Sequence, residues 1–177
     1  MNYVCSLRDE KFASLALIEA EKSNMKHHKH GCIATIGSKI IARGFNSYRC
    51  YAYDGFLNNT CSCHAEIHVI HQLAKILQKK NDRVSSNRNK RKTFYDKISL
   101  YVVRKDKYGI NYKHSAPCNH CTNTMKTLNI KYIIYSNISG TLTKCRVKDY
   151  NSSHISQGNR FLNRIMAKKS RSDKNER

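Results

Sequence analysis

The stretch SAPCNHC, residues 115–121, places two cysteines three positions apart directly behind Pro117, the only proline of the 177-residue chain. A Cys-x-x-Cys pair of this kind is found in redox centres, in structural zinc sites and in catalytic metal centres. These uses differ in the residues that accompany the pair, so the rest of the chain decides among them.

A second segment, His64-Ala65-Glu66, supplies the residue types that complete a catalytic metal centre. Cys118 and Cys121, on the first turn of an expected helix, point the same way, and the positive end of the helix dipole favours their thiolates. With His64 they offer three zinc ligands, and tetrahedral zinc then keeps its fourth position for water, which is typical of catalytic sites. Zinc-bound water loses a proton near neutral pH. Glu66 is placed to take a proton from that water and pass it to a leaving group.

The elements that must position these residues follow from the hydrophobic pattern. Residues 6–23 lack glycine and proline and begin with a Ser6/Asp9 capping box, which predicts a helix. Two β-branched runs around Gly37 and Ser38 predict a hairpin over residues 32–45. Further expected elements are a helix at 64–80, a strand at 98–104, a helix beginning at the cysteines, strands at 131–136 and 141–147, and a terminal helix near 160–167. The basic stretch after the second helix shows no periodicity and is expected to form a mobile loop. This order predicts one mixed α/β layered domain.

Charge is the strongest bulk signal. The chain has 33 Lys and Arg against 12 Asp and Glu, a formal net charge of +21. Residues 79–92 and 164–177 together carry +10 of this, so +11 remains on the rest of the chain. A basic body suits a phosphate-bearing substrate or a nucleic acid, whereas biased composition and a solvated surface would explain the charge equally well.

Cysteine usage and hydropathy indicate the compartment. The N-terminus carries charges where a signal peptide needs an apolar run, and no apolar stretch approaches the length of a membrane span. We therefore expect an intracellular, cytoplasmic protein with reduced thiols, in which closely spaced cysteines favour metal binding over disulfides.

Together these motifs resemble the zinc-dependent cytidine and deoxycytidylate deaminase superfamily, whose zinc motifs are shared by tRNA adenosine deaminases. The resemblance covers roughly residues 12–135 and includes the hairpin GCIATIGSKIIARGFN, the strand LYVV and the segment LNIKYIIYS. It implies a three-layer cytidine-deaminase-like α/β fold, with a mixed central sheet and helices on both faces. The implied domain spans residues 1–150 with a basic loop insertion at 79–97, followed by a basic C-terminal extension at 151–177.

The resemblance also implies substrate contacts and a reaction. In that family an asparagine closing the hairpin contacts the sugar or base of the substrate, which assigns this role to Asn46, and the backbone at Ala65 contacts the base edge. The implied activity is hydrolytic deamination of a cytosine-type nucleotide of the dCMP or CMP class, with zinc as cofactor and a homo-oligomer as the assembly. Two alternatives stay open: a deaminase acting on RNA or single-stranded DNA, and a catalytically idle fold that binds nucleic acid through its basic surface or serves a structural role. The insertion between the 98–104 strand and Pro117 borders the pocket and departs from the compact members of the family.

Two other metal arrangements compete with the catalytic centre. Cys61 and Cys63 could join Cys118 and Cys121 in a structural four-cysteine zinc site, leaving His64 and Glu66 as surface residues. Independently, a second structural zinc could be held by residues near the 64–80 helix, namely Cys50, Cys61, Cys63, His68 and His71.

Overall fold

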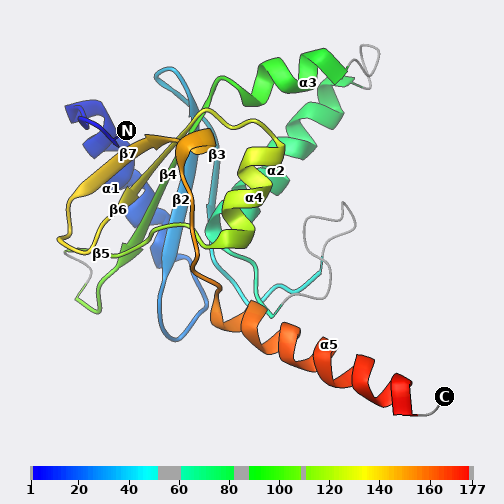
Figure 1. Ribbon diagram of the computed structural model, residues 1–177. Coiled ribbons are helices and arrows are strands. Elements are labelled where there is room, and N and C mark those ends of the chain that lie inside the picture. Colours follow the sequence, from blue (N-terminus) through cyan, green and yellow to red (C-terminus); the bar gives the residue numbers. More distant parts are fainter. Residues whose placement is uncertain (1, 52–60, 82–87, 109–110, 176–177) are drawn as a thin grey trace.

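The computed structural model describes residues 2–51, 61–81, 88–108 and 111–175. Its elements follow the expected order with four additions, namely β1, α3, β5 and a 3-10 turn (Figure 1). They are β1 (Asn2–Tyr3), α1 (Leu7–Glu21), β2 (His30–Ile36), β3 (Lys39–Phe45), α2 (Ala65–Asn81), α3 (Arg88–Tyr95), β4 (Ile98–Lys105), β5 (Tyr112–Lys113), α4 (Asn119–Thr127), β6 (Tyr132–Ser136), β7 (Leu142–Arg146), a 3-10 turn (Val147–Asp149) and α5 (Gln157–Asn175).

Within the described residues the sheet has seven strands in the order β1-β7-β6-β4-β2-β3, with the short β5 added to β4. The β4–β6 pair is parallel and the other pairs are antiparallel, which makes the sheet mixed as predicted. Helix α1 covers one face, and α2 with α4 covers the other (Figure 1). The predicted three-layer α/β fold is therefore confirmed.

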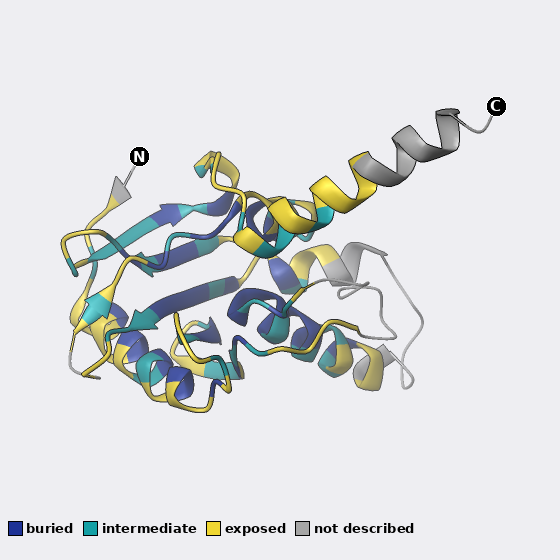
Figure 2. Cartoon of the chain, turned by 90° about the horizontal axis from the view of Figure 1, so that it is seen from below, coloured by how far each residue is buried: buried dark blue, intermediate teal, exposed yellow. Residues whose placement is uncertain are grey.

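The two faces of β4 show how strand alternation builds this layering. Ile98, Leu100 and Val102 belong to the core under α2 and α4, whereas Tyr101 and Val103 belong to the smaller core under α1. Both sets are almost fully buried, as Figure 2 shows by the dark strands between the helices. Successive side chains of a strand point to opposite faces of the sheet. On β2 and β4, even-numbered residues therefore face α2 and α4, and odd-numbered residues face α1.

Helix α1 begins as its sequence indicates. The Ser6 hydroxyl accepts a hydrogen bond from the Asp9 amide, and the Ser6 amide donates to the Asp9 carboxylate at 2.9 Å, which completes the capping box. The buried face of the helix carries Ala16 and Ala20, and these small side chains let it approach β2 closely. A Cβ atom on Gly31 would lie 1.9 Å from the Ala16 carbonyl oxygen, so only glycine fits there.

The β2–β3 hairpin also agrees with the prediction. Gly37 has a φ of 59°, the left-handed conformation that a tight turn requires and that glycine adopts without strain. The hairpin register carries one irregularity between Ala34 and Thr35.

The basic segment differs from the expected loop. Helix α2 continues to Asn81, and residues 88–95 form α3, whose last two residues Phe94 and Tyr95 pack against the core of the α2 layer. Packing of these two aromatic side chains stabilises α3, although its other residues are polar and its sequence lacks an amphipathic repeat. Residues 82–87 lie outside the described part.

The terminal helix α5 is longer than the predicted 160–167 helix and leads away from the body of the molecule (Figures 1 and 2). No helix in the described ranges is long and apolar enough to cross a membrane.

Candidate active site

The candidate site lies where α2 and α4 begin, at the same end of the sheet as the start of β2 (Figure 1). His64 directly precedes α2, and its position is fixed by a two-bond bridge just before it. The Ser47 amide donates to the Cys63 carbonyl at 3.0 Å, and the Cys63 amide donates to the Ser47 carbonyl at 2.9 Å. Ser47, two residues after the end of β3, therefore anchors the start of α2.

Both cysteines of the SAPCNHC segment meet His64. Cys118 is the N-cap of α4, and Cys121 lies in its first turn. Their Sγ atoms lie 3.5 Å and 3.3 Å from His64 Nδ1, and the three ligand atoms all fall within 4.8 Å of one another. Usual zinc–sulfur and zinc–nitrogen bonds at a tetrahedral angle place such atoms roughly 3.5 Å apart. The three residues thus fit a zinc ion without rearrangement of the backbone.

The site favours a thiolate. The hydrogen bond with Cys121, followed by the hydrogen bond with His64, lowers the pKa of the Cys118 thiol to about 3. The same bond with Cys118, together with burial, raises the pKa of the Cys121 thiol. A thiolate at Cys118 is the form of the side chain that binds a metal ion.

Glu66 is buried beside the three ligands, with 5% of its surface exposed. Burial raises the pKa of its carboxyl, and the Cys118 charge adds to this, while the charge of His64 acts in the opposite direction. Its side chain also forms a hydrogen bond with Cys121. The carboxyl lies next to the ligand set and is not itself a member of the cluster.

Asn46 and Ala65 lie at the same end of the fold, and Ala65 is fully buried. The Asn46 side-chain oxygen accepts hydrogen bonds from Ser23 Oγ and from the His30 amide, each at 2.8 Å, and its side-chain nitrogen donates to the His28 carbonyl at 2.8 Å. Asn46 thus holds the α1–β2 connection against the hairpin.

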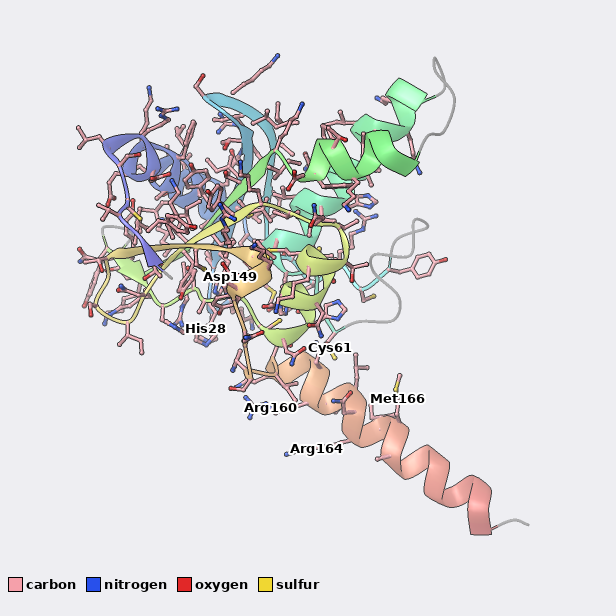
Figure 3. The ribbon with its side chains drawn as sticks, turned by 45° about the horizontal axis from the view of Figure 1, so that its top comes forward. His28, Cys61, Asp149, Arg160, Arg164 and Met166 are labelled. Atoms are coloured by element: carbon pink, nitrogen blue, oxygen red, sulfur yellow. The ribbon has the colours of Figure 1, made fainter. Side chains whose placement is uncertain are left out.

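The alternative metal arrangements do not assemble. Among the described residues, His64, Cys118 and Cys121 form the one metal-sized cluster. Cys61 is exposed and donates through its sulfur to the Gly158 carbonyl at the start of α5, where Figure 3 places it. Cys63 is buried but donates to the His64 carbonyl. Neither sulfur joins the pair at α4.

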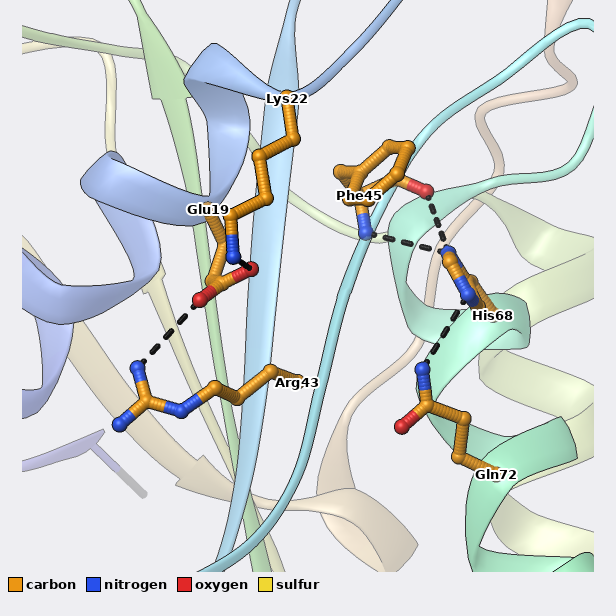
Figure 4. A network of polar contacts seen from close by, with 6 residues as sticks. All are labelled: Glu19, Lys22, Arg43, Phe45, His68 and Gln72. Atoms are coloured by element: carbon orange, nitrogen blue, oxygen red, sulfur yellow. Dashed lines mark hydrogen bonds and ion pairs between the residues drawn. The ribbon is translucent and has the colours of Figure 1, made fainter.

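His68, a member of the second arrangement, is engaged in other contacts. His68 Nδ1 lies 3.0 Å from the Phe45 carbonyl oxygen, and its Nε2 lies 3.2 Å from the side-chain nitrogen of Gln72 (Figure 4). The ring also packs edge-on against the Phe45 ring. His68 therefore joins α2 to β3, while Arg43 and Lys22 bind Glu19 on the far side of the same hairpin.

The residues that hold the cysteine segment in place could not be recognised from the sequence. The Ser115 hydroxyl donates to the Val102 carbonyl at 2.7 Å and lies 2.7 Å from the Ser136 hydroxyl. The Tyr150 hydroxyl donates to the Pro117 carbonyl at 3.2 Å. These contacts attach the segment that leads into α4 both to the sheet and to the residues before α5.

With this geometry described, comparison with known proteins assigns the family. Residues 6–137 match the cytidine and deoxycytidylate deaminase zinc-binding region, so the chain belongs to this deaminase family, whose cofactor is zinc. No curated protein sequence matches the chain significantly.

Solved structures share the fold. The dCMP deaminase of cyanophage S-TIM5, solved in complex with dCMP and dUMP, is 21% identical, with a TM-score of 0.50 over 77% of this chain and 85% of that one. A cytidine deaminase from Burkholderia pseudomallei is 15% identical, with a TM-score of 0.52 over 79% of this chain and 93% of that one. At these identities the likeness concerns the fold alone.

Proposed function

We propose that the protein is a zinc-dependent hydrolase that deaminates a cytosine-type nucleotide of the dCMP or CMP class. The observation that carries the proposal is the convergence of His64, Cys118 and Cys121 with the buried Glu66 beside them. Family membership supports the reaction type, and a dCMP deaminase among the structural neighbours is consistent with the substrate class.

In this proposal each residue has a separate role. His64 and the two cysteines hold the ion, and zinc, when bound, supplies a water of lowered pKa. Glu66 takes a proton and delivers it to the amine that leaves, which requires a carboxyl near the metal that is not a ligand. Asn46 and the backbone at Ala65 contact the sugar and base.

Metal analysis tests the ligand set. The purified protein should contain at least one zinc per chain, and Cys118→Ser should lower this content strongly because it removes one of three ligands. Cys61→Ser is the matched control, because Cys61 contacts α5 and is expected to leave the zinc content unchanged. A folded wild-type protein without zinc would refute the proposal.

A substrate panel tests the substrate class. Deamination of dCMP, CMP, cytidine, a cytosine-containing single strand and tRNA should be compared at several salt concentrations. The proposal predicts preference for a monomer with little salt dependence. The +11 charge outside the two basic segments favours one other candidate, a polymer substrate. That candidate predicts activity on polymers only, falling steeply with salt through counterion release.

We further propose that residues 1–150 form the deaminase domain, that 151–177 form an extension of it, and that the protein is a homo-oligomer. The family match over residues 6–137 is consistent with this division. Sedimentation of the full chain and of a chain ending at residue 150 would test it.

A further inference from the structure

A row of basic residues lies at the site end of the sheet. His30 on β2 is the register partner of Arg104 on β4, and Arg104 is the register partner of Lys113 on β5. Register partners point to the same face of a sheet with their Cα atoms about 5 Å apart. The three residues therefore form a transverse row across three strands.

Strand alternation fixes the face of this row. Cys32 and Val102, each two residues from the row, belong to the core under α2 and α4. Lys105, the residue after Arg104, points to the other face and binds Glu21 of α1 at 2.7 Å. Arg104 is therefore on the same side of the sheet as His64 and the cysteines.

The row is close to the metal ligands. Burial lowers the pKa of the His30 ring to about 4, and the charges of Arg104 and His64, both near enough to act on the ring, work in the same direction. The His30 amide in turn donates to Asn46, the proposed substrate contact. His28, labelled in Figure 3, precedes His30 on the same connection and is also within range of the Arg104 charge.

Arg104 lacks the partners that arginines normally have. Its Nε is buried and donates no hydrogen bond to any described residue, and no ion pair with a described carboxylate is present. Arg146 has a similarly buried Nε, but its guanidinium bonds to the hydroxyls of Tyr132 and Tyr3. The neighbours of Arg104 include His28 and His30, whose pKa values burial lowers, and the basic register partner Lys113.

A buried donor on a charged group calls for an acceptor. The Nε and one Nη of a guanidinium form a fork that matches two oxygens of a phosphate. We infer that Arg104 is the anion-binding residue of the candidate site and takes the phosphate of a nucleoside monophosphate. This inference rests on the proposed function for the identity of the nucleoside, whereas the anion subsite itself depends only on Arg104 and its surroundings.

The first experiment tests the subsite without any nucleoside. Inorganic phosphate is titrated into the full-length, zinc-loaded, ¹⁵N-labelled protein, and the arginine Nε–H signals are followed by NMR. One signal, identified by its loss in Arg104→Lys, should shift and saturate, whereas the signals of other arginines should not. Absence of a saturable Arg104 shift, or equal shifts of several arginines, would overturn the inference whatever the substrate is.

The second experiment measures binding of dUMP and deoxyuridine by calorimetry. A charge-assisted hydrogen-bond pair predicts that wild type binds dUMP at least about tenfold more tightly than deoxyuridine. Arg104→Met should abolish this preference, and Arg104→Lys should keep part of it, because lysine retains the charge but not the fork. Lys105→Met, the adjacent residue on the opposite face, should retain the full preference. Thermal melts of each variant establish that it is folded.

The two experiments separate the two claims. Phosphate binding at Arg104 in a protein that deaminates no cytosine nucleotide would sustain the subsite and refute the proposed function. If the protein deaminates dCMP but Arg104→Met still binds dUMP more tightly than deoxyuridine, the proposed function is supported and the Arg104 subsite is refuted. If Arg104→Met weakens binding of a cytosine-containing single strand but not binding of dUMP, the assignment of a monophosphate to Arg104 is overturned.

Discussion

Two buried carboxylates, one on each face of the sheet, have nearly equal exposure and opposite chemistry. Asp9 of α1 is 2% exposed, and Glu66 of α2 is 5% exposed. Asp9 accepts hydrogen bonds from the Lys144 ammonium and the Tyr101 hydroxyl, in addition to its bond with Ser6. Burial acts to raise its pKa, but the bonds from Ser6, Lys144 and Tyr101 outweigh it and leave the pKa below its ordinary value.

Glu66 forms no ion pair with a lysine or arginine among the described residues. Burial raises the pKa of its carboxyl, and its neighbours are the cysteines and histidine of the candidate metal centre. The difference teaches that burial alone does not mark a functional acid. The identity of the partners does, because a carboxylate held by a lysine and a tyrosine stabilises the fold, whereas one that lies beside metal-binding side chains without a lysine or arginine partner can exchange protons.

The largest expected effect is on turnover in Glu66→Gln. This change keeps the shape of the side chain but removes proton transfer, which typically contributes about 10²- to 10⁴-fold to rate. We expect kcat to fall by that order, while zinc content and the unfolding midpoint stay close to wild type. Loss of zinc from this variant would instead make Glu66 a ligand.

The matched change on the other face, Asp9→Asn, should affect stability rather than rate. It leaves the Lys144 ammonium without its counter-charge and weakens two further hydrogen bonds, which costs about 2–3 kcal/mol in the free energy of unfolding. Urea denaturation measures this loss, and kcat per folded molecule should equal that of wild type. An unchanged unfolding free energy would show that Asp9 is not the structural member of the pair.

A smaller effect is expected for Tyr101→Phe. The Tyr101 hydroxyl donates to Asp9 Oδ1 at 2.8 Å, and its ring packs against Phe12. Removing only the hydroxyl should cost about 1.5 kcal/mol, because one hydrogen bond to a charged group is lost and the ring contact remains. In combination with Asp9→Asn the cost should be less than additive, which a double-mutant cycle would measure.

The smallest effect concerns acid. The folded pKa of Asp9 lies below its ordinary value of 3.8, so the unfolded chain takes up this proton first as the pH falls. The Asp9 contribution is complete above about pH 5 and is lost as the pH falls through the folded pKa. The difference in unfolding free energy between wild type and Asp9→Asn should therefore narrow below about pH 4. A difference that widens in acid would reverse the assigned direction.

The sequence predicted most of this architecture because the relevant signals are local. The capping box at Ser6, the glycine turn at Gly37 and the two helix starts that bring His64 to the cysteines each occupy a few adjacent residues. The apolar run of β4 likewise indicated a strand. Short patterns of this kind predict the structure well because the hydrogen bonds and turn conformations that they specify form within the same element.

The features that sequence reasoning missed depend on distant partners. β1 and β5 are two residues each and exist through pairing with β7 and β4. Helix α3 is held by two aromatic residues at its end and has no periodic pattern. The row of His30, Arg104 and Lys113 requires the strand register, and the hydrogen bonds of Asn46 require the α1–β2 connection to fold back onto the hairpin.

The close contact at Gly31 has a consequence for protein engineering. The spacing of α1 from β2 is a distance between main chains, so no choice of side chains on the helix could accommodate a larger residue at position 31. A substitution there would push the strand toward the opposite layer, where its neighbour His30 lies at the candidate site. A mutational library would therefore find position 31 intolerant although it lies on the far side of the sheet from the metal ligands. Intolerance at position 31 would reflect how closely two backbones approach, whereas intolerance at Glu66 would reflect the chemistry of the site.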